Sequence, residues 1–96
     1  MGFTKVIDKP VDVTDDATAI EGMWQVILFN DDHNAAEFVV ECLMRVFGHN
    51  EQMAMKIMFE AHNTGKALAE VESREKAQLH KDQLQSYGLT ATTEKI

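Results

Sequence analysis

The amino-acid sequence predicts a small α+β domain, a βααβαβ sandwich in which a three-stranded antiparallel sheet packs on three helices. Three observations lead to this fold. Residues Trp24–Phe29 are apolar at every position but one and are bounded by polar turn formers, which is typical of a buried strand. Two segments, 38–47 and 54–61, carry apolar residues at helical spacing, and the C-terminal segment is rich in β-branched residues. A chain of 96 residues is short enough for one domain.

The first helix follows the first strand after a polar loop, Asn30–Asn34. We expect Asn34 to be its N-cap, with Glu37 completing a variant capping box, and Gly48 to end it. Its apolar face consists of Phe38, Val39, Cys42, Leu43, Val46 and Phe47. Cys42 is the only cysteine, so the chain has no internal disulfide, and its place on this face predicts an inert core residue.

The second helix is predicted to begin after Asn50 as its N-cap and to end at Gly65 in the left-handed conformation. Its core stripe has the spacing i, i+3, i+4, i+7 and consists of Ala54, Ile57, Met58 and Ala61. Residues 66–71 alternate roughly and predict a second strand with Ala67, Ala69 and Val71 on one face.

The third helix is predicted to start after Ser73 as its N-cap and to run to about Tyr87, with Gly88 as the stop. It is mostly charged and glutamine-rich, so most of its surface is expected to face water. The segment Leu89–Thr93 is predicted to be the last strand because of its β-branched residues.

Residues 1–22 differ from the rest of the chain, because they show no sustained hydrophobic period and carry more acidic than basic residues. This composition predicts a flexible acidic N-terminal arm in front of a core domain over residues 23–96. A solubilising tail is the alternative interpretation of the arm.

Composition also limits the classes of partner. A formal net charge of −7 argues against a nucleic-acid binder, which needs a basic face, and favours a cationic partner or ligand. The longest uninterrupted apolar run, Val26–Phe29, is far too short for a membrane span, and no signal peptide is recognisable. We therefore expect a cytoplasmic protein that does not contact a membrane.

Asp31, Asp32 and His33 invite an enzymatic interpretation, since they could bind a metal or hold a general base. Three consecutive residues seldom converge on one metal, and no HxxxH or CxxC spacing supports a metal site. No nucleophile elbow, phosphate loop or dinucleotide fingerprint occurs either. We expect no catalysis, no cofactor and no metal. His62 and Asn30 could each have a local structural role, as a hydrogen-bonded histidine and a turn residue.

Several segments resemble the ClpS adaptor family. The resemblance covers roughly residues 24–96 and rests on VILFNDD at 26–32, EFV at 37–39 with Leu43, MFEAHNTGKA at 58–67, Ser73, Glu75 and Ala77, and Thr92, Glu94 and Lys95. An NDD turn followed about thirty residues later by His-x-x-Gly-Lys is fairly specific. The resemblance implies an adaptor, not an enzyme. Such an adaptor binds N-degrons, whose first residue is bulky and hydrophobic, and delivers them to a AAA+ Clp unfoldase of the ClpA or ClpC type.

The resemblance also implies roles for particular residues and a setting for the protein. Contacts to the peptide α-amine would come from Asn30, Asp31, Asp32 and His62. The hydrophobic side-chain pocket would be formed by Asn34, Ala36, Val39, Met58, Ala61 and Leu89. Unfoldase docking would involve Glu75 and His80. We expect a monomer in the cytoplasm or the equivalent plastid stroma. The alternative is a divergent protein-interaction module without degron delivery, comparable to the C-terminal module of the ribosomal stalk protein.

Three departures from the family pattern affect specificity and docking. The usual Thr-Pro-Met after the acidic turn is Asn34-Ala35-Ala36 here, a lysine of the third helix is His80, and the loop before the last strand is shortened to Tyr87-Gly88. Ala36 replaces the methionine that gates the family's pocket against side chains branched at Cβ. We therefore expect a wider pocket mouth that admits Ile and Val, unless Phe59 swings in and refills the space.

Overall fold

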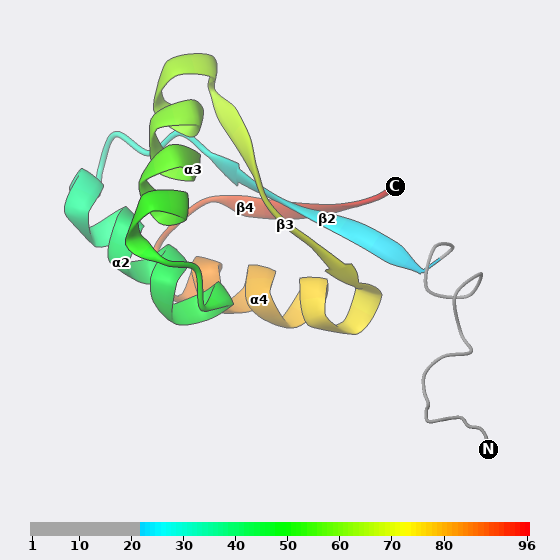
Figure 1. Cartoon of the computed structure of the whole chain (residues 1–96). Helices are drawn as coiled ribbons and strands as arrows, with labels where there is room; N and C mark the ends of the chain where they lie inside the picture. The colour runs from blue at the N-terminus through cyan, green and yellow to red at the C-terminus, as the bar shows by residue number, and fades with distance from the viewer. Residues whose placement is uncertain (1–21) are drawn as a thin grey trace.

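The computed structural model describes residues 22–96, and these form the expected βααβαβ order. The elements, labelled as in Figure 1, are β2 (Met23–Phe29), α2 (Ala36–Phe47), α3 (Glu51–Thr64), β3 (Lys66–Ser73), α4 (Arg74–Ser86) and β4 (Ala91–Lys95). The predicted arm, residues 1–22, lies outside the described residues except for Gly22. No helix within residues 22–96 has the length and hydropathy that a bilayer crossing requires.

The three strands form one antiparallel sheet in the order β3-β2-β4, so the apolar run Val26–Phe29 belongs to the central strand. Val26 and Leu28 are almost fully buried against residues of all three helices. Figure 1 shows the helices gathered along the sheet, with α2 beyond the end of β2. Ile27 points to the face opposite to that of Val26 and Leu28 and is also buried, with 7% of its surface exposed, so consecutive positions of this strand are shielded from water and apolar.

Most helix ends agree with the sequence prediction. Asn50 caps α3, because its side-chain oxygen accepts a hydrogen bond from the Met53 backbone N–H at 2.8 Å. Ser73 caps α4 in the same way through the Lys76 backbone N–H at 3.3 Å. Gly48 and Gly65 end α2 and α3 with φ of 75° and 98°, values that residues with a Cβ rarely adopt. Local sequence therefore determines these boundaries.

The start of α2 differs from the prediction. The helix begins at Ala36 after Ala35, which makes no side-chain capping hydrogen bond, so the predicted Asn34 cap and the capping box with Glu37 are wrong. The Asn34 side chain is turned away from the helix instead. Its amide nitrogen donates to Asp31 Oδ2 at 2.7 Å and to the Gly88 carbonyl oxygen at 3.3 Å. A cap would accept with the side-chain oxygen, whereas here the two hydrogen bonds donated by the amide nitrogen fix the side chain on Asp31 and Gly88.

The strand β3 contains a bulge that changes which residues face the helices. Val26 pairs with Glu70 and Ile27 with Leu68, so Ala69 is an extra residue in β3. Past the bulge, Glu72 lies opposite the core-facing Trp24, whereas Val71 lies opposite Gln25 on the other face. The prediction that Val71 shares the face of Ala67 and Ala69 is therefore wrong, although both alanines are buried as expected.

The last strand begins two residues later than predicted. Leu89 and Thr90 precede β4, and the Leu89 backbone N–H donates to the Leu84 carbonyl oxygen at 3.1 Å, which closes the end of α4. The strand itself is positioned by pairing between Ala91–Lys95 and residues 24–28 of β2. The pairing partner, and not the β-branched composition, therefore sets the start of β4.

Cys42 has the predicted place in the core, with 2% of its surface exposed. Burial raises the pKa of its thiol, and the negative charge of Glu41 acts in the same direction. The thiolate, which is the reactive form, is therefore disfavoured.

Candidate functional site

A cavity of about 180 Å³ opens where β2 ends and α2 and α3 lie next to each other. Its wall consists of Leu28, Phe29, Asn30, Asp31, Asp32, Asn34, Ala36, Val39, Met58, Ala61 and His62. The structure thus brings together all four residues expected to contact an amine and all but one of the expected apolar-pocket residues. The exception is Leu89, which is buried in the core and is not part of this wall.

The polar end of the cavity is held by the chain that leaves β2. The Asn30 backbone N–H donates to the Gly65 carbonyl oxygen at 2.9 Å, which fixes Asn30 beside the last turn of α3 that carries His62. The Asn30 side-chain nitrogen donates to Asp32 Oδ1 at 3.3 Å. The amide nitrogen only donates, so Oδ1 is the atom with which the Asn30 side chain can accept a hydrogen bond from a ligand.

Asp31 and Asp32 have different surroundings despite being neighbours. Asp31 Oδ1 accepts hydrogen bonds from the backbone N–H groups of His33, at 2.7 Å, and Asn34, at 3.0 Å, and its Oδ2 accepts from the Asn34 side chain. Partial burial acts to raise the pKa of the Asp31 carboxyl, but these hydrogen bonds outweigh it and hold the pKa below its usual value. Asp31 therefore orders the loop as an ionised carboxylate, and Asp32 remains exposed near the cavity.

His62 lies exposed on the last turn of α3, and within residues 22–96 its imidazole makes no hydrogen bond. The alternative that His62 is a locally hydrogen-bonded structural histidine therefore finds no support in this part of the chain. A neutral imidazole nitrogen can accept a hydrogen bond. Asn30, Asp32 and His62 together offer acceptors to a ligand that carries several donors and a positive charge.

The other end of the cavity is apolar. Leu28, Val39 and Ala61 are buried and form its inner part, whereas Met58 is half-buried and Ala36 exposed, which places these two at the mouth. Leu28 and Phe29 were not assigned to the site from the sequence. Their position directly before Asn30 in the strand is the signal that could have identified them. Phe59 is 50% exposed and does not line the cavity, so it does not fill the space beside Ala36.

The groups that line the cavity are suited to binding a ligand. No group of three His, Cys, Asp or Glu side chains among residues 22–96 is placed to hold a metal ion. The described site offers anionic and hydrogen-bond-accepting groups at one end and an apolar hollow at the other. A ligand that complements it carries an ammonium group next to a hydrophobic side chain.

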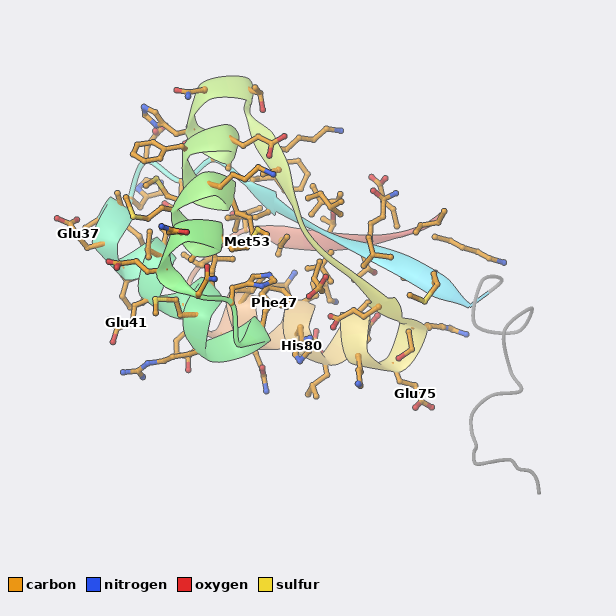
Figure 2. The ribbon with its side chains drawn as sticks, in the orientation of Figure 1. Glu37, Glu41, Phe47, Met53, Glu75 and His80 are labelled. Atoms are coloured by element: carbon orange, nitrogen blue, oxygen red, sulfur yellow. The ribbon has the colours of Figure 1, made fainter. Side chains whose placement is uncertain are left out.

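The residues expected at the docking surface both lie on α4 but differ in accessibility. Glu75 is exposed on the first turn. The His80 side chain is only 19% exposed, its Nδ1 lies 2.6 Å from Glu72 Oε2, and its ring packs edge-on against Phe47 with the centroids 5.0 Å apart. Figure 2 shows His80 beside Phe47 and Glu75 at the far end of the helix.

Comparison with known proteins identifies the family to which this chain belongs. Residues 19–92 match the family of the ATP-dependent Clp protease adaptor protein ClpS. The chain belongs to the ClpS family. The ATP-dependent Clp protease adapter protein ClpS of Mycobacterium tuberculosis is 37% identical over 83 residues, which are 86% of this chain and 76% of that protein. The Mycobacterium leprae protein of the same description is 34% identical over 83 residues, covering 86% and 71%.

A solved structure extends the similarity to three dimensions. Agrobacterium tumefaciens ClpS2, bound to L-phenylalaninamide, superposes with a TM-score of 0.69 at 32% sequence identity, covering 79% of this chain and 99% of that chain. The resemblance inferred from the sequence is therefore confirmed, as is the α+β fold. As a member of the ClpS family, the chain is a non-catalytic adaptor of the Clp protease.

Proposed function

We propose that the cavity binds the N-terminal residue of N-degron substrates, and that the protein then delivers them to a ClpA- or ClpC-type unfoldase. The observation that carries this proposal is the juxtaposition of Asn30, Asp32 and His62 with the apolar hollow between α2 and α3. An α-amino group has three donors and a positive charge. Asn30 Oδ1 and His62 accept from it, Asp32 adds negative potential, and Asp31 acts through the loop that it orders.

The expected affinity suits an adaptor that must release its cargo. Charge-assisted hydrogen bonds contribute ~1.5–3 kcal/mol each. Burial of one large apolar side chain contributes ~1.5–3 kcal/mol more. Together they reach about −8 kcal/mol, which corresponds to a micromolar dissociation constant. L-phenylalaninamide, the ligand of the Agrobacterium protein, has this combination of an amino group and a benzyl side chain.

Delivery rests on parts of the chain outside the cavity. We assign unfoldase docking to Glu75 and His80 on α4, and engagement by the unfoldase to the N-terminal arm, residues 1–22, which precedes the core domain 23–96. The protein acts as a monomer in the cytoplasm or the plastid stroma. A second candidate function is cargo binding without delivery. One observation favours it: the His80 side chain contacts Glu72 and is mostly buried, so it is not presented at the surface to an unfoldase.

The test of cargo recognition is fluorescence anisotropy with short peptides that differ only in their first residue and in acetylation of the amine. Peptides beginning with Phe or Leu are expected to bind. Acetylation removes the charge and two donors, so we expect at least a tenfold loss of affinity, or about 1.4 kcal/mol. Equal binding of free and acetylated peptides would rule out amine recognition and leave His62 without a role in the site.

A further inference from the structure

The turn between α4 and β4, residues 87–90, is bonded to the polar wall of the cavity at two places. Figure 1 shows this turn leading from the end of α4, next to α2, to the start of β4. The Phe29 backbone N–H donates to the Thr90 carbonyl oxygen at 3.0 Å. The Asn34 side-chain nitrogen donates to the Gly88 carbonyl oxygen at 3.3 Å. The turn therefore holds the wall segment 29–34 at its first and its last residue.

The same turn contacts α2 through the side chain of Tyr87. The Tyr87 ring packs edge-on against Phe38, with the centroids 6.3 Å apart and the planes at 85°, an arrangement that aromatic pairs favour. Phe38 lies in the first turn of α2, and its neighbours Ala36 and Val39 line the cavity. The turn 87–90 is thus in contact with the elements that supply both the polar and the apolar wall.

The first turn of α2 depends on such packing, because it lacks a side-chain cap. Ala35, at the N-cap position, makes no side-chain hydrogen bond to the helix. Phe38 and Tyr87 are 37% and 38% exposed, and neither lines the cavity. The pair can therefore act on a ligand in the cavity only through the position of the residues beside it.

The turn itself is fixed to the end of α4. The Gly88 backbone N–H donates to the Gln85 carbonyl oxygen at 2.9 Å, and the Leu89 backbone N–H donates to the Leu84 carbonyl oxygen at 3.1 Å. The Leu89 side chain is buried, with 4% of its surface exposed. These contacts give Tyr87 a defined place from which to support α2.

The ring of Tyr87 is the part that supports the first turn. Arg45 lines the same small hollow of about 130 Å³ as Tyr87, but it lies on the last turn of α2. Its guanidinium is exposed and is already paired with Glu41 at 2.9 Å. A contact between the hydroxyl and Arg45 would therefore not place Ala36 and Val39.

We propose that Tyr87 is a positioning residue for cargo binding, and that its packing on Phe38 holds the first turn of α2 at the distance from the polar loop that the cargo residue requires. This inference rests on the proposed function of the cavity. A site held in its binding geometry loses less free energy to ordering when the ligand binds. Without the ring, the two walls are less well placed to engage the amine and the side chain together.

The test measures the affinity of the full-length variants for a Phe-first peptide by fluorescence anisotropy, with urea unfolding to establish that each variant is folded. Tyr87→Ala is expected to bind about fivefold more weakly than the natural chain, and Tyr87→Phe, which keeps the ring, within about twofold of it. Should Tyr87→Ala fail to fold, Tyr87→Leu, which keeps apolar bulk without the ring, is expected to bind about threefold more weakly.

Two further variants separate positioning from a general loss of stability. Ser73→Ala removes the N-cap at the opposite end of α4, so it should lower the free energy of unfolding and leave peptide affinity unchanged. Phe38→Ala should weaken peptide binding as Tyr87→Ala does. The double variant should bind within about twofold of either single variant, because both substitutions remove the same contact.

The outcomes distinguish this inference from the proposed function. Unchanged affinity in a folded Tyr87→Ala or Tyr87→Leu variant would show that the ring does not position the cavity, while the amine site stands. An equal loss of affinity in Ser73→Ala, an equal loss in Tyr87→Phe, or losses that multiply in the double variant would each overturn the role given to the Phe38 contact. Failure of the natural chain to bind any free-amine peptide would overturn both the inference and the proposed function.

Discussion

Asn34 and Gly88 are 54 positions apart in the chain and are joined by a hydrogen bond from the Asn34 side-chain nitrogen to the Gly88 carbonyl oxygen at 3.3 Å. The same nitrogen donates to Asp31 Oδ2 at 2.7 Å. Asn34 therefore connects the loop at the polar end of the cavity, residues 30–34, with the turn that follows α4. The loop's geometry depends on a segment far away in sequence.

Replacing Asn34 tests this connection. Asn34→Ala removes both hydrogen bonds, and each contributes ~0.5–1.5 kcal/mol net, so we expect the free energy of unfolding to fall by about 1–3 kcal/mol. Affinity for a Phe-first peptide should also fall, because the loop carrying Asp32 is less well held. Urea unfolding and anisotropy measure the two effects. The control, Asn63→Ala at an exposed position on α3, should leave stability nearly unchanged; an equal loss there would contradict the role given to Asn34.

The pKa of Asp31 predicts how the loop responds to acid. Because the folded-state pKa lies below the usual value of 3.8, the ionised carboxylate stabilises the fold at pH values above 3.8. This contribution is lost as the pH falls through the folded-state pKa. The stability difference between the natural chain and Asp31→Ala should therefore be constant near neutral pH and shrink below about pH 4. Urea unfolding across this range measures it, and a difference that grows on acidification would show the sign to be wrong.

The third prediction is that Ala36 determines which N-terminal side chains the cavity accepts. It lies exposed at the mouth of the cavity, and Phe59 does not fill the space beside it. A hydrophobic pocket separates side chains one methylene apart by only ~1–3 kcal/mol, so without a gating methionine we expect Ile- and Val-first peptides to bind within about tenfold of Leu-first peptides. Phe- and Trp-first peptides should also bind.

Ala36→Met is expected to restore exclusion of Ile and Val. Ala35→Met, at the neighbouring exposed position outside the cavity wall, is the matched control and should leave the ranking of peptides unchanged. If the natural chain already rejects Ile and Val, Ala36 does not open the mouth.

The fourth prediction is that deletion of the N-terminal arm separates peptide binding from delivery to the unfoldase. In the described part of the chain, the residues that line the cavity lie between Leu28 and His62, so we expect deletion of residues 1–22 to leave peptide affinity unchanged. Degradation of a Phe-first reporter by the partner unfoldase and its protease should cease if the unfoldase engages the arm as we propose. A truncated chain that still promotes degradation would favour the solubilising-tail interpretation.

Glu75 and His80 should behave differently when replaced. Glu75→Ala removes an exposed side chain, so we expect weaker binding to the unfoldase without a change in the free energy of unfolding. His80→Ala also loses the contacts with Phe47 and leaves the Glu72 carboxylate, whose side chain is 12% exposed, without its partner. That should lower the free energy of unfolding by about 1–3 kcal/mol. Pull-down with the unfoldase and urea unfolding separate the effects, and unchanged binding for both variants would favour cargo binding without delivery.

The sequence by itself determined the order of elements, the central strand and most helix ends, because these depend on interactions within a few residues. An uninterrupted apolar run indicates a strand, Asn50 and Ser73 cap the helix that follows them directly, and Gly48 and Gly65 have a conformation that favours glycine over other residues. Of the ten residues that the resemblance to the ClpS family assigned to amine and side-chain binding, nine line the cavity.

Only the tertiary structure decided the features that depend on distant partners. Asn34 could cap a helix from its local context, but its amide nitrogen donates to Asp31 and Gly88, and the side chain makes no capping hydrogen bond. Pairing with β2 sets the start of β4 and places the bulge at Ala69, which turns Glu72 toward His80. The cavity exists because the fold places the end of β2 beside α2 and α3. Each of these outcomes is a competition between local preference and long-range pairing, and the second partner is not visible in the local sequence.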